Sequence, residues 1–277
     1  MKVAAIVTPK EKNRWDNKFY IATNDLYSLT NYLNTFGFFD ILFLGYTGEG
    51  YELSMDEVKE VLKFAEEYKF KIKKKGKVII NITRNEKKEI KEIMEMGEWC
   101  DYFMINRNNL DNKSFFSIIK NSKKPIIYYL SCLSEEKDKK KEFLEFLINE
   151  EKIVGIKDSL EEDWEDRKRV VEGYGKVYFF GRDLNFLKEK KGNVISGTIQ
   201  LFPQLWREER YDLIERIVKK IEEKEKEVRF PEICKYFLSY SPPFVPLIKG
   251  DDVKEENLKK LEDLKEFYVD LKRKNKF

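Results

Sequence analysis

Short apolar runs recur along the 277-residue chain, and amphipathic segments separate them. The runs are rich in Ile, Val, Phe and Tyr, which favours β-strands. Between the runs, apolar residues follow a helical spacing, as at Val58, Val61 and Leu62. The pattern predicts eight strands, each followed by a helix, at residues 3–8, 39–45, 77–83, 101–106, 125–131, 153–158, 176–181 and 193–197.

The predicted strands are continuously apolar rather than alternating, which is typical of a parallel sheet covered by helices. Eight strand–helix units in a chain of this length predict an α/β fold, a closed (β/α)8 TIM barrel, at residues 1–202. A doubly wound open sheet is the alternative. Residues 203–277 are expected to form the final barrel helix and a C-terminal three-helix appendage, with helical stretches at 203–228, 231–238 and 253–274 around a Ser241-Pro242-Pro243 break.

Composition narrows the chemistry. The sequence contains no His, so the commonest general base and the commonest zinc ligand are both missing. Any reaction must then use Lys, Tyr, Ser, Thr, Cys or carboxylates. The 54 Lys and Arg nearly balance the 51 Asp and Glu, giving a net charge of +3, which argues against a nucleic-acid partner.

Targeting features are not predicted. Three widely separated cysteines indicate neither a zinc cage nor a disulfide framework. No apolar run has the length of a signal-peptide core or of a membrane span, so we expect a cytoplasmic protein with no membrane partner. The high content of Lys, Glu and Ile suits a thermophile, although an AT-rich genome would produce a similar bias.

A lysine lies at the end of one apolar strand. In residues 153–158 (IVGIKD), period-two alternation places Lys157 on the same face as Ile153 and Gly155. If that face lines the barrel interior, burial lowers the pKa of the amine and makes it a nucleophile for a carbonyl carbon. The alternative is a lysine that extends into solvent at the end of the strand.

Polar residues follow other predicted strands, where the active sites of TIM barrels lie. The turn GYTGEG at 45–50 contains Tyr46, Thr47 and Gly48, and it exposes backbone N–H groups suited to a carboxylate or a phosphate. Its glycines are equally compatible with a simple tight turn. Further along, Tyr128 and Tyr129 must point to opposite faces of their strand, so only one of them can enter the barrel.

Taken together, these segments resemble the dihydrodipicolinate synthase/N-acetylneuraminate lyase family of class I pyruvate aldolases and lyases, over nearly the whole chain. The resemblance is carried by AIVTP at 5–9, the turn at 45–50, PIIYY at 125–129, VGIKD at 154–158 and NVIS at 193–196. The end of the turn, KDS at 157–159 and PPFVP at 242–246 look closest to archaeal 2-keto-3-deoxygluconate aldolases.

The resemblance implies roles for particular residues. Lys157 would form an imine with C2 of pyruvate, and Tyr129 would transfer the proton at the aldol oxygen. Thr47, with the Gly48 N–H, would hold the substrate carboxylate. Tyr46 and Thr198 are further substrate-binding candidates.

Three arginines extend the predicted substrate site. Arg84, Arg107 and Arg182 follow the third, fourth and seventh predicted strands and are placed to reach an anionic substrate tail, although loop arginines are commonly solvated. The resemblance also implies that the reaction uses no metal or other cofactor and that the partners are a small-molecule keto acid and an aldehyde. It further implies a homo-oligomer, a tetramer.

Three positions depart from the family pattern. Tyr46 replaces the family's usual first Thr or Ser, whose hydroxyl belongs to the proton relay. Residues 105–109 (INRNN) lack the tyrosine that the family usually contributes to a neighbouring subunit. Ser134 stands where dihydrodipicolinate synthases usually have a substrate-binding arginine.

The sequence therefore predicts a class I aldolase that forms or cleaves a 2-keto-3-deoxy sugar acid such as 2-keto-3-deoxygluconate. Two enzyme alternatives are a dihydrodipicolinate synthase-type lyase and a metal-dependent pyruvate aldolase using carboxylates such as those at 161–163. Because two parts of the family's relay are missing, a catalytically weakened paralogue that binds a keto acid is a third alternative.

Overall fold

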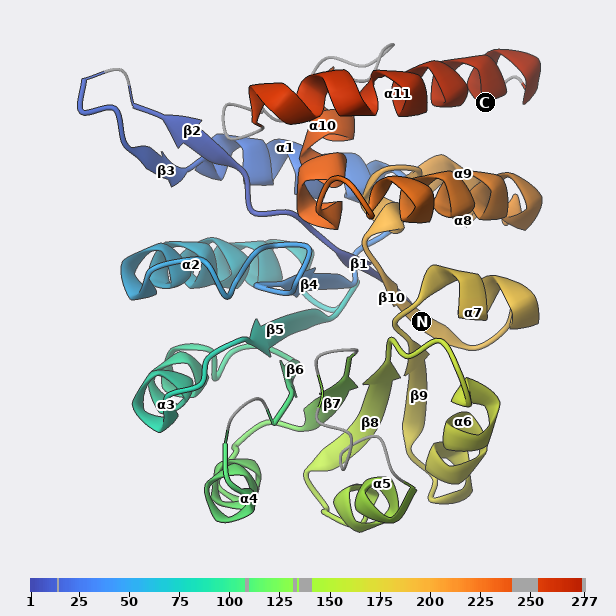
Figure 1. The fold of residues 1–277 in the computed structure, drawn as a ribbon. Coiled ribbons are helices and arrows are strands. Elements are labelled where there is room, and N and C mark those ends of the chain that lie inside the picture. Colours follow the sequence, from blue (N-terminus) through green and yellow to red (C-terminus); the bar gives the residue numbers. More distant parts are fainter. Residues whose placement is uncertain (14, 108–109, 132–133, 135–140, 241–253, 276–277) are drawn as a thin grey trace.

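The computed structural model describes residues 1–277 except 14, 108–109, 132–133, 135–140, 241–253 and 276–277. Eight parallel strands close into a barrel, in the spatial order β1-β10-β9-β8-β7-β6-β5-β4, and β4 pairs back with β1 (Figure 1). The predicted (β/α)8 barrel is confirmed, and the open sheet is excluded. The strands are β1 (Lys2–Ala5), β4 (Ile41–Phe43), β5 (Val78–Ile82), β6 (Tyr102–Ile105), β7 (Ile126–Leu130), β8 (Ile153–Asp158), β9 (Val177–Phe180) and β10 (Asn193–Ser196).

Helices surround the barrel, and the last of them gather beside β1 and β10 (Figure 1). A capping box begins α2: Ser54 Oγ accepts a hydrogen bond from the Glu57 N–H, and the Glu57 carboxylate accepts one from the Ser54 N–H. No helix in the described ranges is long and apolar enough to cross a membrane. The helices are α1 (Thr23–Thr35), α2 (Met55–Ile72), α3 (Lys87–Met96), α4 (Asn112–Lys120), α5 (Lys141–Ile148), α6 (Trp164–Gly173), α7 (Asp183–Glu189), α8 (Pro203–Arg207), α9 (Tyr211–Lys224), α10 (Phe230–Tyr240) and α11 (Glu255–Asn275), with a 3-10 helix η2 (Thr198–Gln200) after β10.

Two local features differ from the predicted pattern. A hairpin, β2 (Lys10–Lys12) with β3 (Phe19–Ile21), separates β1 from α1; its first strand is wholly charged, so no apolar run indicates it. The stretch at 203–228 is not one helix but α8 and α9, because Glu209 adopts a left-handed conformation with φ of 56°. The predicted break at Ser241 and the PPFVP segment at 242–246 lie outside the described residues.

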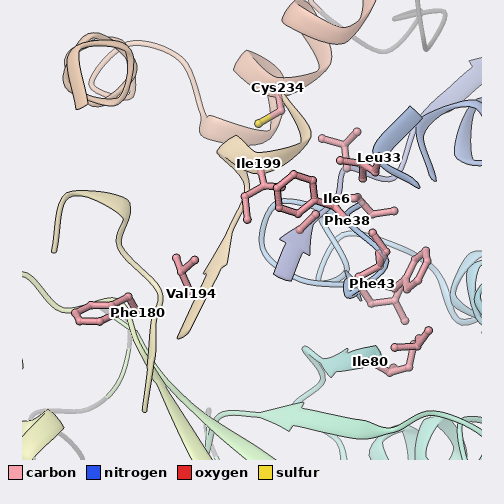
Figure 2. Close-up of a cluster of buried hydrophobic side chains, with 14 of the residues drawn as sticks. Ile6, Leu33, Phe38, Phe43, Ile80, Phe180, Val194, Ile199 and Cys234 are labelled. Carbon is pink, nitrogen blue, oxygen red and sulfur yellow. The ribbon is translucent and has the colours of Figure 1, made fainter. Parts of the chain in front are cut away.

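Apolar side chains form two layers. Between the strands and the helices, Phe43, Ile80 and Phe180 belong to one extended buried cluster, which also includes Leu33 and Ile199 (Figure 2). A smaller cluster fills the barrel interior, and seven of the eight strands contribute to it. Its members are Val3, Ala5, Leu42, Ile79, Met104, Ile127, Phe179 and Ile195.

Strand β8 differs from the other barrel strands because it contains a β-bulge. Its pairing with β7 steps from Ile126–Ile153 to Ile127–Gly155, so Val154 is an extra residue in the ladder. Ile153 packs in the outer cluster, whereas Val154 packs against the interior one. The prediction that Ile153 shares the face of Lys157 is therefore wrong, because the bulge shifts the alternation by one residue. From Gly155 onward the prediction is correct, and Lys157 points into the barrel.

Candidate active site

A cavity of about 670 Å³ lies at the carboxyl ends of the barrel strands. Its floor is apolar, with Ala5, Leu42 and Ile195, and one wall comes from α9 and the start of α10. It brings together six of the predicted site residues: Tyr46, Thr47, Tyr129, Lys157, Arg182 and Thr198. Gly48, Arg84 and Arg107 lie outside its lining.

Lys157 is the one buried lysine in the wall of this cavity, and only 7% of its surface is exposed. Its Nζ lies 4.3 Å from the ring centroid of Tyr129, its register partner on β7. Burial lowers the pKa of Lys157 to about 8, and the negative charge of Asp183 partly opposes that shift. A cation–π contact stabilises the ammonium less than a carboxylate would, so the amine is readily deprotonated.

Gly181, at the end of β9, leaves room for the lysine side chain. A Cβ at this position would lie 2.9 Å from Lys157 Cε and 2.2 Å from Ser159 Oγ, both inside van der Waals contact. The neighbouring Asp158 points to the other side of the strand, where its Oδ2 accepts hydrogen bonds from Arg167 Nε and the Tyr178 hydroxyl, each at 2.7 Å. Its charge is thus satisfied away from Lys157.

Asp183 is a site residue that the sequence analysis missed. Its Oδ2 accepts hydrogen bonds from Ser196 Oγ at 2.8 Å and Thr198 Oγ1 at 2.7 Å. Burial raises the pKa of Asp183, and these hydrogen bonds and the charge of Lys157 oppose the rise. Thr198 also accepts a hydrogen bond from Trp206 Nε1 at 3.2 Å, so its hydroxyl is held by protein groups although it lines the cavity.

Two residues of the turn at 45–50 line the cavity, and they differ in how far they are exposed to solvent. Thr47 is 7% exposed and lies inside. Tyr46 is 41% exposed, and its ring stacks on Tyr51 with centroids 5.8 Å apart. The Tyr46 ring is therefore partly in solvent and stacked on Tyr51, while it also contributes to the lining of the cavity.

The three predicted arginines occupy different environments. Arg182 lines the cavity but forms ion pairs with Glu161 at 2.6 Å and Glu222 at 3.1 Å. Arg107 is buried and donates to Asn112 Oδ1 at 2.6 Å, and Arg84 donates to the Leu53 carbonyl. Within the described part of the chain, no group of three or more His, Cys, Asp or Glu is arranged to hold a metal ion.

No protein-family model and no curated protein matches the chain. Solved structures do match. YagE, a prophage protein of the dihydrodipicolinic acid synthase family from E. coli K12 in complex with pyruvate, has a TM-score of 0.75 at 17% identity, with 95% of this chain and 98% of that chain covered. A catalytic lysine mutant of the sialic acid aldolase from Ruminococcus gnavus has a TM-score of 0.78 at 16% identity, with 99% and 96% covered.

A third neighbour is the 4-hydroxy-tetrahydrodipicolinate synthase of Methylacidiphilum fumariolicum SolV, with a TM-score of 0.74 at 19% identity and coverage of 99% and 97%. These neighbours are members of the dihydrodipicolinate synthase/N-acetylneuraminate lyase family. At such low identity, the likeness establishes a shared architecture. The chain therefore has the (β/α)8 barrel of these lyases and aldolases, with additional C-terminal helices, over nearly its whole length.

Proposed function

We propose that this protein is a class I aldolase that forms an imine between Lys157 and pyruvate. The neutral Nζ adds to the C2 carbonyl, and loss of water gives the imine. Removal of a proton from the methyl carbon gives an enamine, which attacks an aldehyde carbon and forms the new carbon–carbon bond. Water then hydrolyses the imine and releases the 2-keto acid; cleavage runs through the same steps in reverse.

The observation that carries this proposal is the state of Lys157: a buried amine that faces a cavity and has a pKa of about 8. At pH 7 such a lysine is about 9% neutral, whereas a lysine of ordinary pKa 10.5 is about 0.03% neutral. Burial thus raises the concentration of the nucleophilic form about 300-fold.

The groups around Lys157 suit the remaining steps. Thr47 lies in the same cavity, on a turn whose backbone N–H groups suit a carboxylate. Tyr129 is the aromatic neighbour of Nζ, and we assign its hydroxyl the proton transfer at the aldol oxygen. The names of the neighbours support the same chemistry, because one contains pyruvate and another is described as a catalytic lysine mutant.

The test is reductive trapping. The chain is incubated with pyruvate and borohydride, and its intact mass is compared with those of Lys157→Met and of Lys219→Met, a variant of an exposed lysine at the cavity rim. We expect one reduced pyruvate adduct on the native chain and on Lys219→Met, and none on Lys157→Met. An adduct that persists in Lys157→Met, or its absence from the native chain, overturns the proposal.

We infer a 2-keto-3-deoxy sugar acid such as 2-keto-3-deoxygluconate as the product. Arg182 is neutralised by Glu161 and Glu222, which favours an uncharged aldehyde over an anionic one. Condensation with glyceraldehyde should therefore exceed condensation with aspartate semialdehyde, the aldehyde of the dihydrodipicolinate synthase alternative. A greater rate with aspartate semialdehyde contradicts this choice.

The position of Tyr46 favours a second candidate, a protein that binds a keto acid without aldol turnover. Its ring is 41% exposed and stacks on Tyr51, and its phenol stands where the family resemblance implies the shorter Thr or Ser hydroxyl of the relay, so the reach of the relay is changed. Imine trapping without product from any aldehyde supports this second candidate. A tetramer and a cytoplasmic location remain predictions, and light scattering tests the first.

A further inference from the structure

A buried ion pair lies behind the turn at 45–50, which we call the carboxylate loop. Glu49 Oε2 lies 2.5 Å from Lys235 Nζ, which comes from α10. The side chains are 8% and 4% exposed, so both charges have left water. Burying two charges costs free energy that their attraction only partly offsets, and the best-attested role of such a pair is to specify one arrangement of the chain.

The carboxylate loop has a conformation that its surroundings must maintain. Leu44 and Glu49 both adopt left-handed backbone angles, with φ of 58° and 50°. Gly50 folds back onto the strand end so closely that a Cβ would lie 2.2 Å from the Leu44 carbonyl oxygen. Left-handed angles at residues with side chains are unfavourable, and they persist only where neighbouring groups impose them.

Helix α10 meets the carboxylate loop through Lys235, and its first residue, Phe230, packs beside the end of β10 close to Thr47. Lys235 holds Glu49 from behind, and the Phe230 ring packs so close to Gly197 that a Cβ there would lie 2.4 Å from Phe230 Cε1 and 3.1 Å from Thr47 Oγ1. The Thr47 hydroxyl and the Phe230 ring therefore both lie close to Gly197, and both line the cavity.

The same helix end is tied to its surroundings by further charges. Arg229 lies 3.2 Å from Glu49 Oε1 and 3.0 Å from Glu232 Oε1. Glu232 in turn accepts a hydrogen bond from Asn257 of α11. The ion pair behind the loop is thus the inner end of a network that runs to the last helix.

We propose that Lys235 is a positioning residue for substrate recognition: by fixing Glu49, it fixes the Thr47 hydroxyl that receives the pyruvate carboxylate. Lys235 is not among the residues that line the cavity, so we assign it a role through Glu49 and no contact with the substrate. We expect the loss of Lys235 to affect the binding of the substrate carboxylate and not the imine lysine. Lys157 belongs to β8, whereas Lys235 contacts the carboxylate loop. This inference rests on the proposed function.

A positioning role for Lys235 can be distinguished from a role in stability alone by measuring how strongly the protein prefers pyruvate to a ketone that has no carboxylate. Pyruvate and acetone present the same methyl ketone to Lys157, and only pyruvate has a carboxylate. In Lys235→Met, we expect the half-saturating pyruvate concentration for reductive trapping to rise at least tenfold, while the trapping rate with acetone stays within about twofold of the native value. The preference for pyruvate should therefore fall at least tenfold.

Three further variants make the test decisive. Lys235→Arg keeps the charge and should recover most of the preference. Glu49→Gln combined with Lys235→Met leaves no unpaired buried charge and should show the same loss of preference in a folded chain. Lys224→Met removes an ion pair to Asp263 at 3.0 Å, which joins α9 to α11 away from the loop, and it should leave the preference unchanged.

Equal losses with pyruvate and acetone in Lys235→Met would make Lys235 a structural residue and overturn the inference. So would an unchanged preference, or failure of both Lys235→Met and the double variant to fold, since the pair would then serve the fold alone. These outcomes are distinct from failure of the proposed function, in which the native chain itself traps no pyruvate.

Discussion

Replacing Lys157 with Met should make the protein more stable at neutral pH, although it removes the proposed nucleophile. Lys157 has an apolar stem packed at Gly181 and an ammonium over the ring of Tyr129, and only 7% of its surface is exposed. Met has a similar length and no charge, so it keeps the packing and avoids the cost of burying a cation. A reactive residue thus lowers the stability of the fold that holds it.

The magnitude follows from the pKa of Lys157. Its value falls from 10.5 in the unfolded chain to about 8 in the folded one, and each pKa unit corresponds to 1.36 kcal/mol, so the cost is about 3 kcal/mol. Below pH 8 the ammonium is present in both states, and the folded state bears the full cost. Between pH 8 and 10.5 the folded state has lost the proton and the unfolded state has kept it, so the cost falls as pH rises. Above 10.5 both states are neutral, and the cost is gone.

The assay is urea unfolding of the native chain and Lys157→Met at pH 7 and at pH 10, followed by fluorescence. We expect the variant to be more stable by about 2–3 kcal/mol at pH 7, and this difference should fall to about 1 kcal/mol or less at pH 10. Lys219→Met, which loses an exposed lysine, is the control and should show no such pH-dependent gain. A variant that is no more stable at pH 7, or a gain that is equal at both pH values, refutes the reasoning.

Three other predictions concern the same site and its support. The rate of reductive trapping with pyruvate should rise with pH, reach half its maximum near pH 8 and level off above about pH 9, and Asp183→Asn should move this midpoint to lower pH because Asp183 raises the pKa of Lys157; a midpoint unmoved or moved upward contradicts this. Gly181→Ala should lower trapping at least tenfold in a folded protein, since its Cβ would displace Lys157; native-like trapping would show that the lysine tolerates displacement. Gln200→Ala should lower the unfolding free energy by about 2–4 kcal/mol, because this buried side chain accepts from the Val7 N–H and donates to the Ala5 carbonyl, each at 3.0 Å; the exposed Gln204→Ala is its control, and equal losses would refute the role.

The barrel was predictable from the sequence because its strands are continuous apolar runs, and eight such runs alternate with amphipathic segments. The bulge at Val154 was not, because it depends on how β8 pairs with β7 and not on the residues of β8 alone. The hairpin before α1 was missed because its strands are charged or largely exposed. Its sequence therefore lacks the apolar run by which the buried strands were recognised.

The residues of the candidate site likewise fall into those that local sequence predicts and those that depend on tertiary packing. Lys157, Tyr129 and Thr47 were predictable because each lies at or near the end of a strand, and all strand ends of a parallel barrel meet at one face. Asp183 also follows a strand, and its position was the available signal, but charged residues follow strands too often to single it out. The partnership of Glu49 with Lys235 spans 186 positions and depends on how the C-terminal helices pack, which periodicity does not specify.

The boundary predicted at residue 202 separates the barrel strands from the later helices, but residues from both sides of it line the cavity. Val218 and Ile221 of α9 and Phe230 of α10 form one wall of the cavity, and Trp206 of α8 donates to the Thr198 hydroxyl that Asp183 also holds. These helices cover the cavity at the carboxyl ends of the strands. Without them, that end of the barrel would be open to water. A buried amine with a depressed pKa requires that water be excluded. The C-terminal helices therefore help to keep water from Lys157, and the cavity is built jointly by the barrel and the helices that follow it.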